Sequence, residues 1–504
     1  MAPNEVKDLK ISPAMPGGED IAVADSEHLK SSNHHEPFEV FQQEEGQVDF
    51  RTVSWIRASA IFLKMLFATG ILSIPSVMYD LGAVPGALNV LGWCGLNTYG
   101  ALVLGDFRDR YPQCHTVADM AQLMGGPIFR EVVGFLFIMT YVITAASGVI
   151  GVSAAFNALS LHSLCTVWFS VIATVIIALC ASVRKFAHIG WLTWVGFASI
   201  LGAVFIIVIG VTTLSRPSTA PQQGPYDLGY HLTNHPTFAA GITASSTIFV
   251  SSAATSAFLP VIAEMRPPTA PAYRKAVALC MTFITASYLT FSLVLYRYCG
   301  KWVASPALGS AGPVLKRVAY GIALPGLLVS GALYIHVAAK YLFVRVLRGS
   351  PQRRRHLQAN TLVHWGTWLA CVVGMAATAW VLASAIPVFT YVLALVGALG
   401  FAPLGISLPG VCWLYVNVWR GREGEQEGER SDRGRKKKKE KKKEKKKKGL
   451  VWMVLCAVHV GLVLLGLFMM VGGTYGVVVQ IRQAYRDGSV DGVFSCADNS
   501  GTVS

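Results

Sequence analysis

Long apolar runs separated by short polar segments dominate this chain of 504 residues. Most of the runs approach the ~20 apolar residues that a helix needs to cross a bilayer. We place eleven of them, near 55–78, 84–105, 132–157, 164–182, 188–213, 238–263, 276–297, 318–343, 362–384, 387–416 and 450–478. The pattern predicts an all-α membrane protein with about eleven transmembrane helices.

The polar segments divide the chain into parts. Residues 1–50 are rich in Glu, Asp, Ser and Pro and lack the apolar core of a signal peptide, so we expect a disordered tail. We expect a transmembrane domain over 51–480, with a charged loop at 419–449, and a short tail at 481–504. Lys and Arg are concentrated in every second connection between the runs, and the connection after the seventh run is the one exception. Because cytoplasmic connections carry the excess of Lys and Arg, this places the N-terminus and the charged loop in the cytoplasm. Eleven spans then put the C-terminal tail outside.

The order of the runs indicates two halves. A segment rich in Pro, Gly and Gln, near 215–236, separates the fifth run from the sixth, so the first ten runs divide as five plus five. Two halves with an odd number of spans insert with opposite topology, which is the inverted repeat of many secondary transporters. We therefore expect an inverted repeat, although no residue-level repeat is visible.

The first run of each half is interrupted by small residues and a proline. Gly70 and Pro75 lie in the first run, and seven small or hydroxyl residues precede Pro260 in the sixth. Both spans are expected to be discontinuous, because Pro removes a backbone donor and clashes with the preceding turn. The freed N–H groups suit a carboxylate and the freed carbonyls suit an ammonium group, so the two breaks together suit an amino acid. The alternative is that the small residues only allow close helix packing. The expected substrate-binding residues are Ala68, Thr69, Gly70, Ile71, Ser251, Ser252, Ala254 and Thr255.

Composition excludes several other classes of protein. Hydrophobic residues make up 53% of the chain and charged residues 14%, whereas soluble proteins carry about 25% charge. The net charge of +15 is local, because 433–448 holds thirteen basic and two acidic residues, so nucleic acid is not an expected partner. The ten cysteines form no CxxC pair, so no metal or other cofactor is expected, although Cys299 and Cys496 would both lie outside and could pair. No catalytic motif is present, and we expect a protein that is not an enzyme.

Two motifs resemble those of the amino acid/auxin permease family, and most of all its fungal neutral amino acid transporters. The stretch from Lys64 to Pro75 is similar to the family pattern K-x-x-x-G-x-G-[VIL]-L-x-[LI]-P, with Ala68 in place of the first glycine. The stretch from Leu259 to Pro268 is similar to L-P-x-x-x-E-M-x-x-P, and a weaker match begins at Ser305. The resemblance covers about 50–480. It implies a LeuT-like five-plus-five fold with an eleventh helix, and inward transport of neutral amino acids driven by protons.

Four ionisable residues within the runs are candidates for coupling or gating, since charges in the membrane are costly. Lys64 either replaces a coupling cation, or ties the two halves together through backbone carbonyls, or snorkels to the interface. Glu264 either carries the coupling proton or forms a gate pair with a Lys or Arg, and we favour the gate. His336 and His459 are more simply packing histidines than proton relays.

The basic stretch 435–448 allows two interpretations. It either binds anionic lipid of the inner leaflet or forms a solvated linker.

The function that we expect is proton-coupled symport of neutral amino acids by alternating access. An amino acid sensor and a vacuolar exporter of the same fold are the alternatives. We expect the plasma membrane, with the vacuolar membrane as the alternative.

Overall fold

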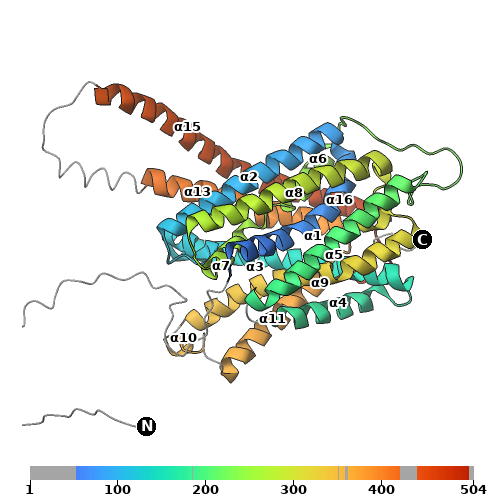
Figure 1. The fold of residues 1–504 in the computed structure, drawn as a ribbon, viewed down its shortest axis with the longest axis horizontal. Helices are drawn as coiled ribbons and strands as arrows, with labels where there is room; N and C mark the ends of the chain where they lie inside the picture. Colours follow the sequence, from blue (N-terminus) through green and yellow to red (C-terminus); the bar gives the residue numbers. More distant parts are fainter. Residues whose placement is uncertain (1–52, 184–185, 350, 358–360, 420–439, 499–504) are drawn as a thin grey trace, which may run out of the picture. The chain divides into compact units, whose positions relative to one another are not determined.

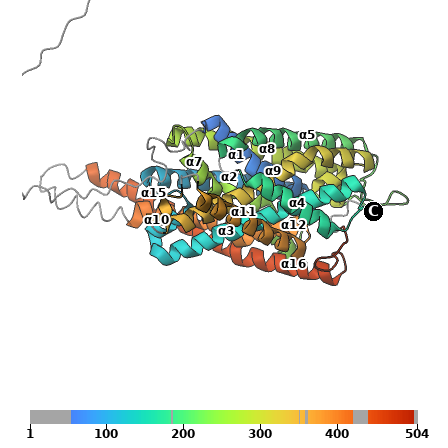
Figure 2. The same cartoon turned by 90° about the horizontal axis from the view of Figure 1, so that it is seen from below.

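A computed structural model describes residues 53–183, 186–349, 351–357, 361–419 and 440–498. Ten helical segments are long and apolar enough to cross a membrane, and an eleventh, α4 (Thr166–Ala181), is shorter. The first half consists of α4 together with α1 (Trp55–Leu81), α2 (Ala83–Arg110), α3 (Val117–Ser160) and α5 (Phe186–Thr213). The second half contains α6 (Phe238–Val250), α7 (Phe258–Ala263), α8 (Ala270–Cys299), α9 (Pro313–Arg348), α11 (Leu362–Ala385), and α12 (Phe389–Val396) with α13 (Leu408–Leu414). The last span is α15 (Glu440–Phe468) with α16 (Thr474–Arg486). Most of the helices, among them α1, α2, α5, α8 and α9, run side by side along a common direction (Figures 1 and 2), and α15 runs obliquely to them in Figure 1.

The predicted spans agree with these helices, and the differences have local causes. The third run begins earlier than predicted, because α3 starts at Val117 with a capping box between Thr116 and Asp119. A kink at Gly126, with φ of 76°, divides its first turns from the apolar part. The predicted loop 419–449 is helical from Glu440 onwards, and its residues 420–439 lie outside the described part of the chain, as does the tail 1–50.

Packing between the spans supports the five-plus-five division. Each of the first four spans packs against its counterpart in the second half: α1 on α6, α2 on α8, α3 on α9 and α4 on α11. Other pairs also come in matching sets, since α1 packs on α5 as α6 does on α12, and α5 packs on α9 as α12 does on α3. A packing pattern that survives exchange of the two halves is the one that an inverted repeat requires. The last span packs outside this set, on α13 and α6.

Different bonds close the two ends of the helix bundle, which we call the Cys165 end and the Glu264 end. At the Cys165 end, a disulfide joins Cys165 to Cys496, and the Phe494 amide donates to the Ser384 carbonyl at 3.2 Å. The pairing of Cys299 with Cys496, which the sequence left open, does not occur, because Cys299 is buried at the end of α8 and remains free. At the Glu264 end, Val53 and Met265 form an isolated bridge that ties the start of α1 to the residues after α7.

Candidate functional site

Span six is broken where the sequence predicted. Helix α6 ends at Val250, a short 3-10 turn covers Ala254–Ala257, and α7 begins at Phe258. Between them the amides of Ser251, Ser252 and Ala253 donate three residues back instead of four, at 3.1 to 3.3 Å. Small side chains allow this tight, irregular backbone, which is tolerated in a membrane only when protein surrounds it.

Span one is continuous, so the prediction of a discontinuous first helix is wrong. Helix α1 runs without interruption through Gly70 and Pro75. Side chains support its backbone instead, since the Ser73 hydroxyl donates to the Gly70 carbonyl at 3.1 Å and the Ser76 hydroxyl to the Ser73 carbonyl at 2.7 Å. These hydroxyls reach carbonyls close to the one that Pro75 deprives of its amide, that of Ile71, and proline is tolerated in membrane helices where neighbouring groups compensate. A proline and a glycine therefore do not suffice to unwind it.

The predicted residues of the two spans meet around Gly70. The Ser73 and Ser251 hydroxyls lie 3.3 Å apart, and a Cβ at Gly70 would lie 2.9 Å from the Ser251 Cβ. The other predicted residues are buried in the same two spans, except that the side chain of Thr69 lies outside the described part of the structure. The buried residues are Ala68, Ile71, Ser252, Ala254 and Thr255.

Side chains from spans two, three and seven surround the break, and the sequence analysis missed them. Asn97 donates to the Ser252 hydroxyl at 2.8 Å, and Tyr141 hydrogen-bonds the Ser256 hydroxyl at 2.8 Å. The Tyr288 hydroxyl lies within hydrogen-bond distance of one carbonyl of span one and one of span six, to which it can donate in turn. The signal in the sequence was the presence of polar side chains inside apolar runs. The sequence did not show which side of each helix faces the break in span six. The Thr255 hydroxyl and the Asn97 carbonyl oxygen are buried and have no hydrogen-bond partner among the described residues. Such groups call for an explanation.

Lys64 is fully buried and joins span one to span eight. Its ammonium donates to the Gly326 carbonyl at 2.8 Å and to the Ser330 hydroxyl at 2.7 Å. Gly196 makes room for it, because a Cβ there would lie 2.7 Å from Lys64 Cε. Snorkelling to the interface is therefore wrong for Lys64.

The acceptor for Lys64 comes from an irregular turn of α9. The Gly326 amide donates to the Ser199 hydroxyl at 3.0 Å, and this hydroxyl donates to the Ile322 carbonyl at 2.7 Å. The hydroxyl thus stands between the two groups that an undisturbed helix would pair. The signal that the sequence analysis missed was Pro325 followed by Gly326 inside a long apolar run.

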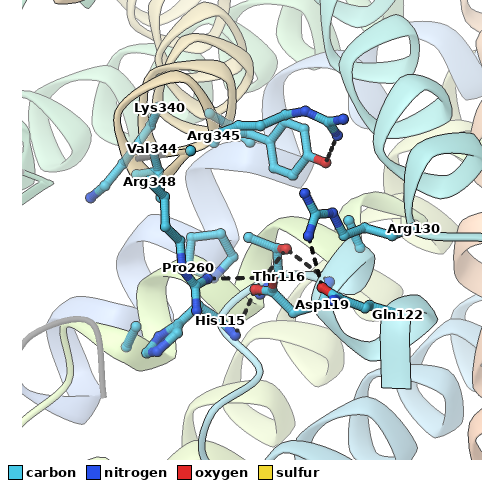
Figure 3. A pocket seen from close by; sticks show the side chains of 15 residues that line it. His115, Thr116, Asp119, Gln122, Arg130, Pro260, Lys340, Val344, Arg345 and Arg348 are labelled. Atoms are coloured by element: carbon cyan, nitrogen blue, oxygen red, sulfur yellow. Dashed lines mark hydrogen bonds and ion pairs between the residues drawn. The ribbon is translucent and has the colours of Figure 1, made fainter. Parts of the chain in front are cut away.

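Glu264 forms an ion pair with Lys340 of α9 at the Glu264 end, and both side chains are largely buried. Beside the pair lies a cavity of about 430 Å³, and none of the eight predicted substrate-binding residues lines it. Figure 3 shows Arg345 and Arg348 facing Asp119 and Arg130 across this cavity. The expected hollow between the two spans at Gly70 is occupied instead, since the Tyr288 hydroxyl fills it.

The two histidines lie in packed, hydrogen-bonded surroundings. His336 Nδ1 lies 3.3 Å from the Ala181 carbonyl, and its ring packs on Trp368. His459 Nε2 lies 2.6 Å from the Tyr99 hydroxyl, and its ring stacks on Trp413. Both placements agree with the packing role that we favoured.

Comparison with known proteins identifies the family. The model of the transmembrane amino acid transporter proteins matches residues 51–419. A transmembrane transporter of Gibberella moniliformis is 43% identical over 99% of this chain and 96% of its own length. The N amino acid transport system protein of Neurospora crassa is 27% identical over 90% of this chain and 91% of its own.

A solved structure of a Na⁺-coupled sialic acid symporter shares the fold, with a TM-score of 0.50, 12% identity, and coverage of 89% of this chain and 94% of the symporter. The family and these relatives are transporters, which confirms the prediction that the chain is not an enzyme. This chain belongs to the transmembrane amino acid transporter family.

Proposed function

We propose that this protein is a secondary active transporter that carries neutral amino acids together with protons by alternating access. The observation that carries the proposal is the buried Lys64 ammonium between spans one and eight, held by the Gly326 carbonyl and the Ser330 hydroxyl. Oxygen atoms of this kind are also the ligands of hard metal cations. A fixed ammonium there does the electrostatic work of a coupling cation, and an amine, unlike a metal ion, can release and regain a proton.

A neutral substrate is supported by the side chains around the break in span six. Those of Asn97, Tyr141, Ser252 and Thr255 are polar but uncharged. They can hydrogen-bond the carboxylate and ammonium of an amino acid, whereas a buried charged substrate side chain would need a partner of opposite charge. The relative from Neurospora crassa, named as an amino acid transport protein, supports the substrate class.

The two ends of the bundle support an orientation. Disulfides persist in oxidising compartments, so the Cys165–Cys496 bond favours an extracellular or lumenal Cys165 end. Arg130, Arg345 and Arg348 gather at the Glu264 end, which suits the cytoplasm. The Glu264–Lys340 pair then acts as the cytoplasmic gate between span six and span eight. We place the protein in the plasma membrane, with the N-terminus in the cytoplasm.

The test is uptake by the purified protein in proteoliposomes. Labelled neutral amino acids should accumulate under an inward proton gradient, and a protonophore should abolish the accumulation. An inward Na⁺ gradient at equal pH is the control and should give only background uptake. Accumulation driven by Na⁺, or transport that no gradient affects, would contradict proton coupling, and preference for charged amino acids would contradict the substrate class.

A further inference from the structure

The Tyr288 hydroxyl connects the two spans that form the candidate site. It lies 2.8 Å from the Leu66 carbonyl of α1 and 2.9 Å from the Ser251 carbonyl, which follows the last turn of α6. The side chain is 1% exposed and comes from α8, the seventh span. One hydroxyl thus stands between backbone acceptors of spans one and six.

The donor count at this point does not match the acceptor count. A phenolic hydroxyl has one proton, so it can donate fully to only one of the two carbonyls at a time. A primary ammonium has three N–H donors and can serve both carbonyls together. The pair of carbonyls therefore fits an ammonium group better than it fits the hydroxyl that now occupies it.

Gly70 explains how the hydroxyl reaches this position. A Cβ at Gly70 would lie 2.1 Å from the Tyr288 oxygen, so the glycine leaves the space that the hydroxyl fills. The same space adjoins Ser251, because a Cβ added at Gly70 would lie 2.9 Å from the Cβ of Ser251. Gly70 thus leaves space beside two backbone carbonyls, as we expected of a subsite for an ammonium group. In this structure the Tyr288 hydroxyl occupies that space.

We propose that the Tyr288 hydroxyl is a placeholder that occupies the substrate's ammonium subsite in the empty carrier and withdraws when an amino acid binds. This rests on the proposed function, because it assumes a substrate with an α-ammonium group. The placeholder supplies a donor to the Ser251 carbonyl, at the break where the regular helical pairing of span six ends, while the carrier returns empty. It also makes the site selective, since a ligand with two N–H donors serves both carbonyls, whereas a ligand with one N–H donor gains nothing over the hydroxyl.

The test compares Tyr288→Phe with Tyr273→Phe in proteoliposomes. Tyr273 is a matched control, because it lies in the same helix, is 2% exposed, and donates to a single carbonyl, that of Ala101 in α2. We expect Tyr288→Phe to bind amino acids about two- to tenfold more tightly, since a substrate no longer has to break a hydrogen bond worth ~0.5–1.5 kcal/mol. Net uptake should fall several-fold, because the empty carrier returns without a donor for the Ser251 carbonyl at the break, while exchange of internal for external amino acid persists. Tyr273→Phe should leave the ratio of net uptake to exchange unchanged.

The outcomes separate the possible roles of Tyr288. If Tyr288 only stabilises the packing of spans one, six and seven, Tyr288→Phe will lower net uptake and exchange equally without tighter binding. That result would overturn the proposal. Absence of amino acid transport by the unaltered protein would overturn both the placeholder and the proposed function. Transport by the unaltered protein, together with an unchanged ratio in Tyr288→Phe, would overturn the placeholder alone.

A second measurement needs no variant and remains decisive if Tyr288→Phe does not fold. Competition for uptake by alanine and its N-methyl, N,N-dimethyl and N-trimethyl forms should fall sharply where the second N–H is lost. 2-Aminoisobutyrate adds a methyl group but keeps all N–H donors, so it controls for bulk. Equal competition by the N-methyl and N-trimethyl forms would overturn the proposal.

Discussion

Spans one and six occupy equivalent places in the two halves, yet one is continuous and the other is broken. In span one, hydroxyls of Tyr288 and Tyr334 from neighbouring helices donate to carbonyls of an intact helix. In span six, three residues, Ser251 to Ala253, leave the helix between α6 and the short turn. The difference shows that a run of small residues loosens a membrane helix more effectively than a single glycine and proline supported by its neighbours.

The two spans also contribute charges of opposite sign to the same partner. Lys64 of span one and Glu264 after span six both bind span eight, at Gly326 and Ser330 and at Lys340 respectively. Span eight is therefore the common support for both members of the pair. The continuous span carries its charge in the buried core and the broken span carries its charge at the Glu264 end, so only the latter is placed to act as a gate.

The largest effect is expected from filling the space between the two spans. Gly70→Val should abolish uptake while the protein still reaches the membrane, because its Cβ would lie 2.1 Å from the Tyr288 oxygen. Gly92→Val is the control, since a Cβ there meets no atom within 4 Å. Uptake of a labelled amino acid, normalised to surface protein, is the measurement. Normal uptake by Gly70→Val would remove Gly70 from the site.

The charge of span one is the next target. Lys64→Met should abolish gradient-driven accumulation, because it removes the proposed proton carrier and two hydrogen bonds from a charged donor, worth ~1.5–3 kcal/mol each. The exposed residue Lys275 provides the control, as Lys275→Met leaves this contact intact. Accumulation is measured with and without a proton gradient. Undiminished accumulation by Lys64→Met would exclude Lys64 from coupling.

The charge of span six should have a smaller effect on a different step. Glu264→Gln leaves Lys340 buried without its carboxylate, and breaking a buried pair costs ~3–5 kcal/mol. We expect the Glu264 end to open, measured as faster labelling of Val337→Cys in the adjacent cavity by an impermeant thiol reagent.

The matched control for the gate is Glu131→Gln, whose partner is Arg345. This pair is considerably more exposed than Glu264–Lys340, so its loss should cost only ~0–1 kcal/mol. Equal labelling rates in the two variants would argue against a gate at Glu264.

The smallest effect concerns one hydroxyl of span six. Thr255→Val removes a buried hydroxyl that has no partner among the described residues, so thermal stability should change little. If that hydroxyl binds substrate, the KM should rise about fivefold, in line with a hydrogen bond worth ~1 kcal/mol. Ser73→Ala in span one should instead lower stability, because its hydroxyl already donates to the Gly70 carbonyl. An unchanged KM for Thr255→Val would remove Thr255 from the site.

Much of the fold could be predicted because a bilayer imposes a simple rule on every span. The runs at 55–78, 362–384 and 387–416 correspond closely to α1, α11 and the helical segment Phe389–Trp419, since apolar length alone defines a crossing helix. The break in span six was also predictable, because several consecutive small residues leave a helix few side-chain contacts.

The site was harder to predict than the spans, because its partners are distant in the sequence. Lys340, Ser330 and Tyr288 lie 76, 266 and 37 positions from the residues that they bind. The disulfide joins residues 331 positions apart, and its partner for Cys496 could not be chosen in advance, because an apolar sequence does not reveal which cysteine faces the surface.

The sequence by itself determined that this chain crosses the membrane several times, where its apolar helices lie, and where span six loosens. These properties depend on hydrophobicity and on local backbone freedom, which are written in consecutive residues. Only the tertiary structure decided that span one stays helical, which groups receive Lys64 and Glu264, and what fills the space at Gly70. Those outcomes depend on side chains that other helices bring from far along the chain. Which donor a backbone carbonyl binds is set by the packing of these helices and not by the residues next to it.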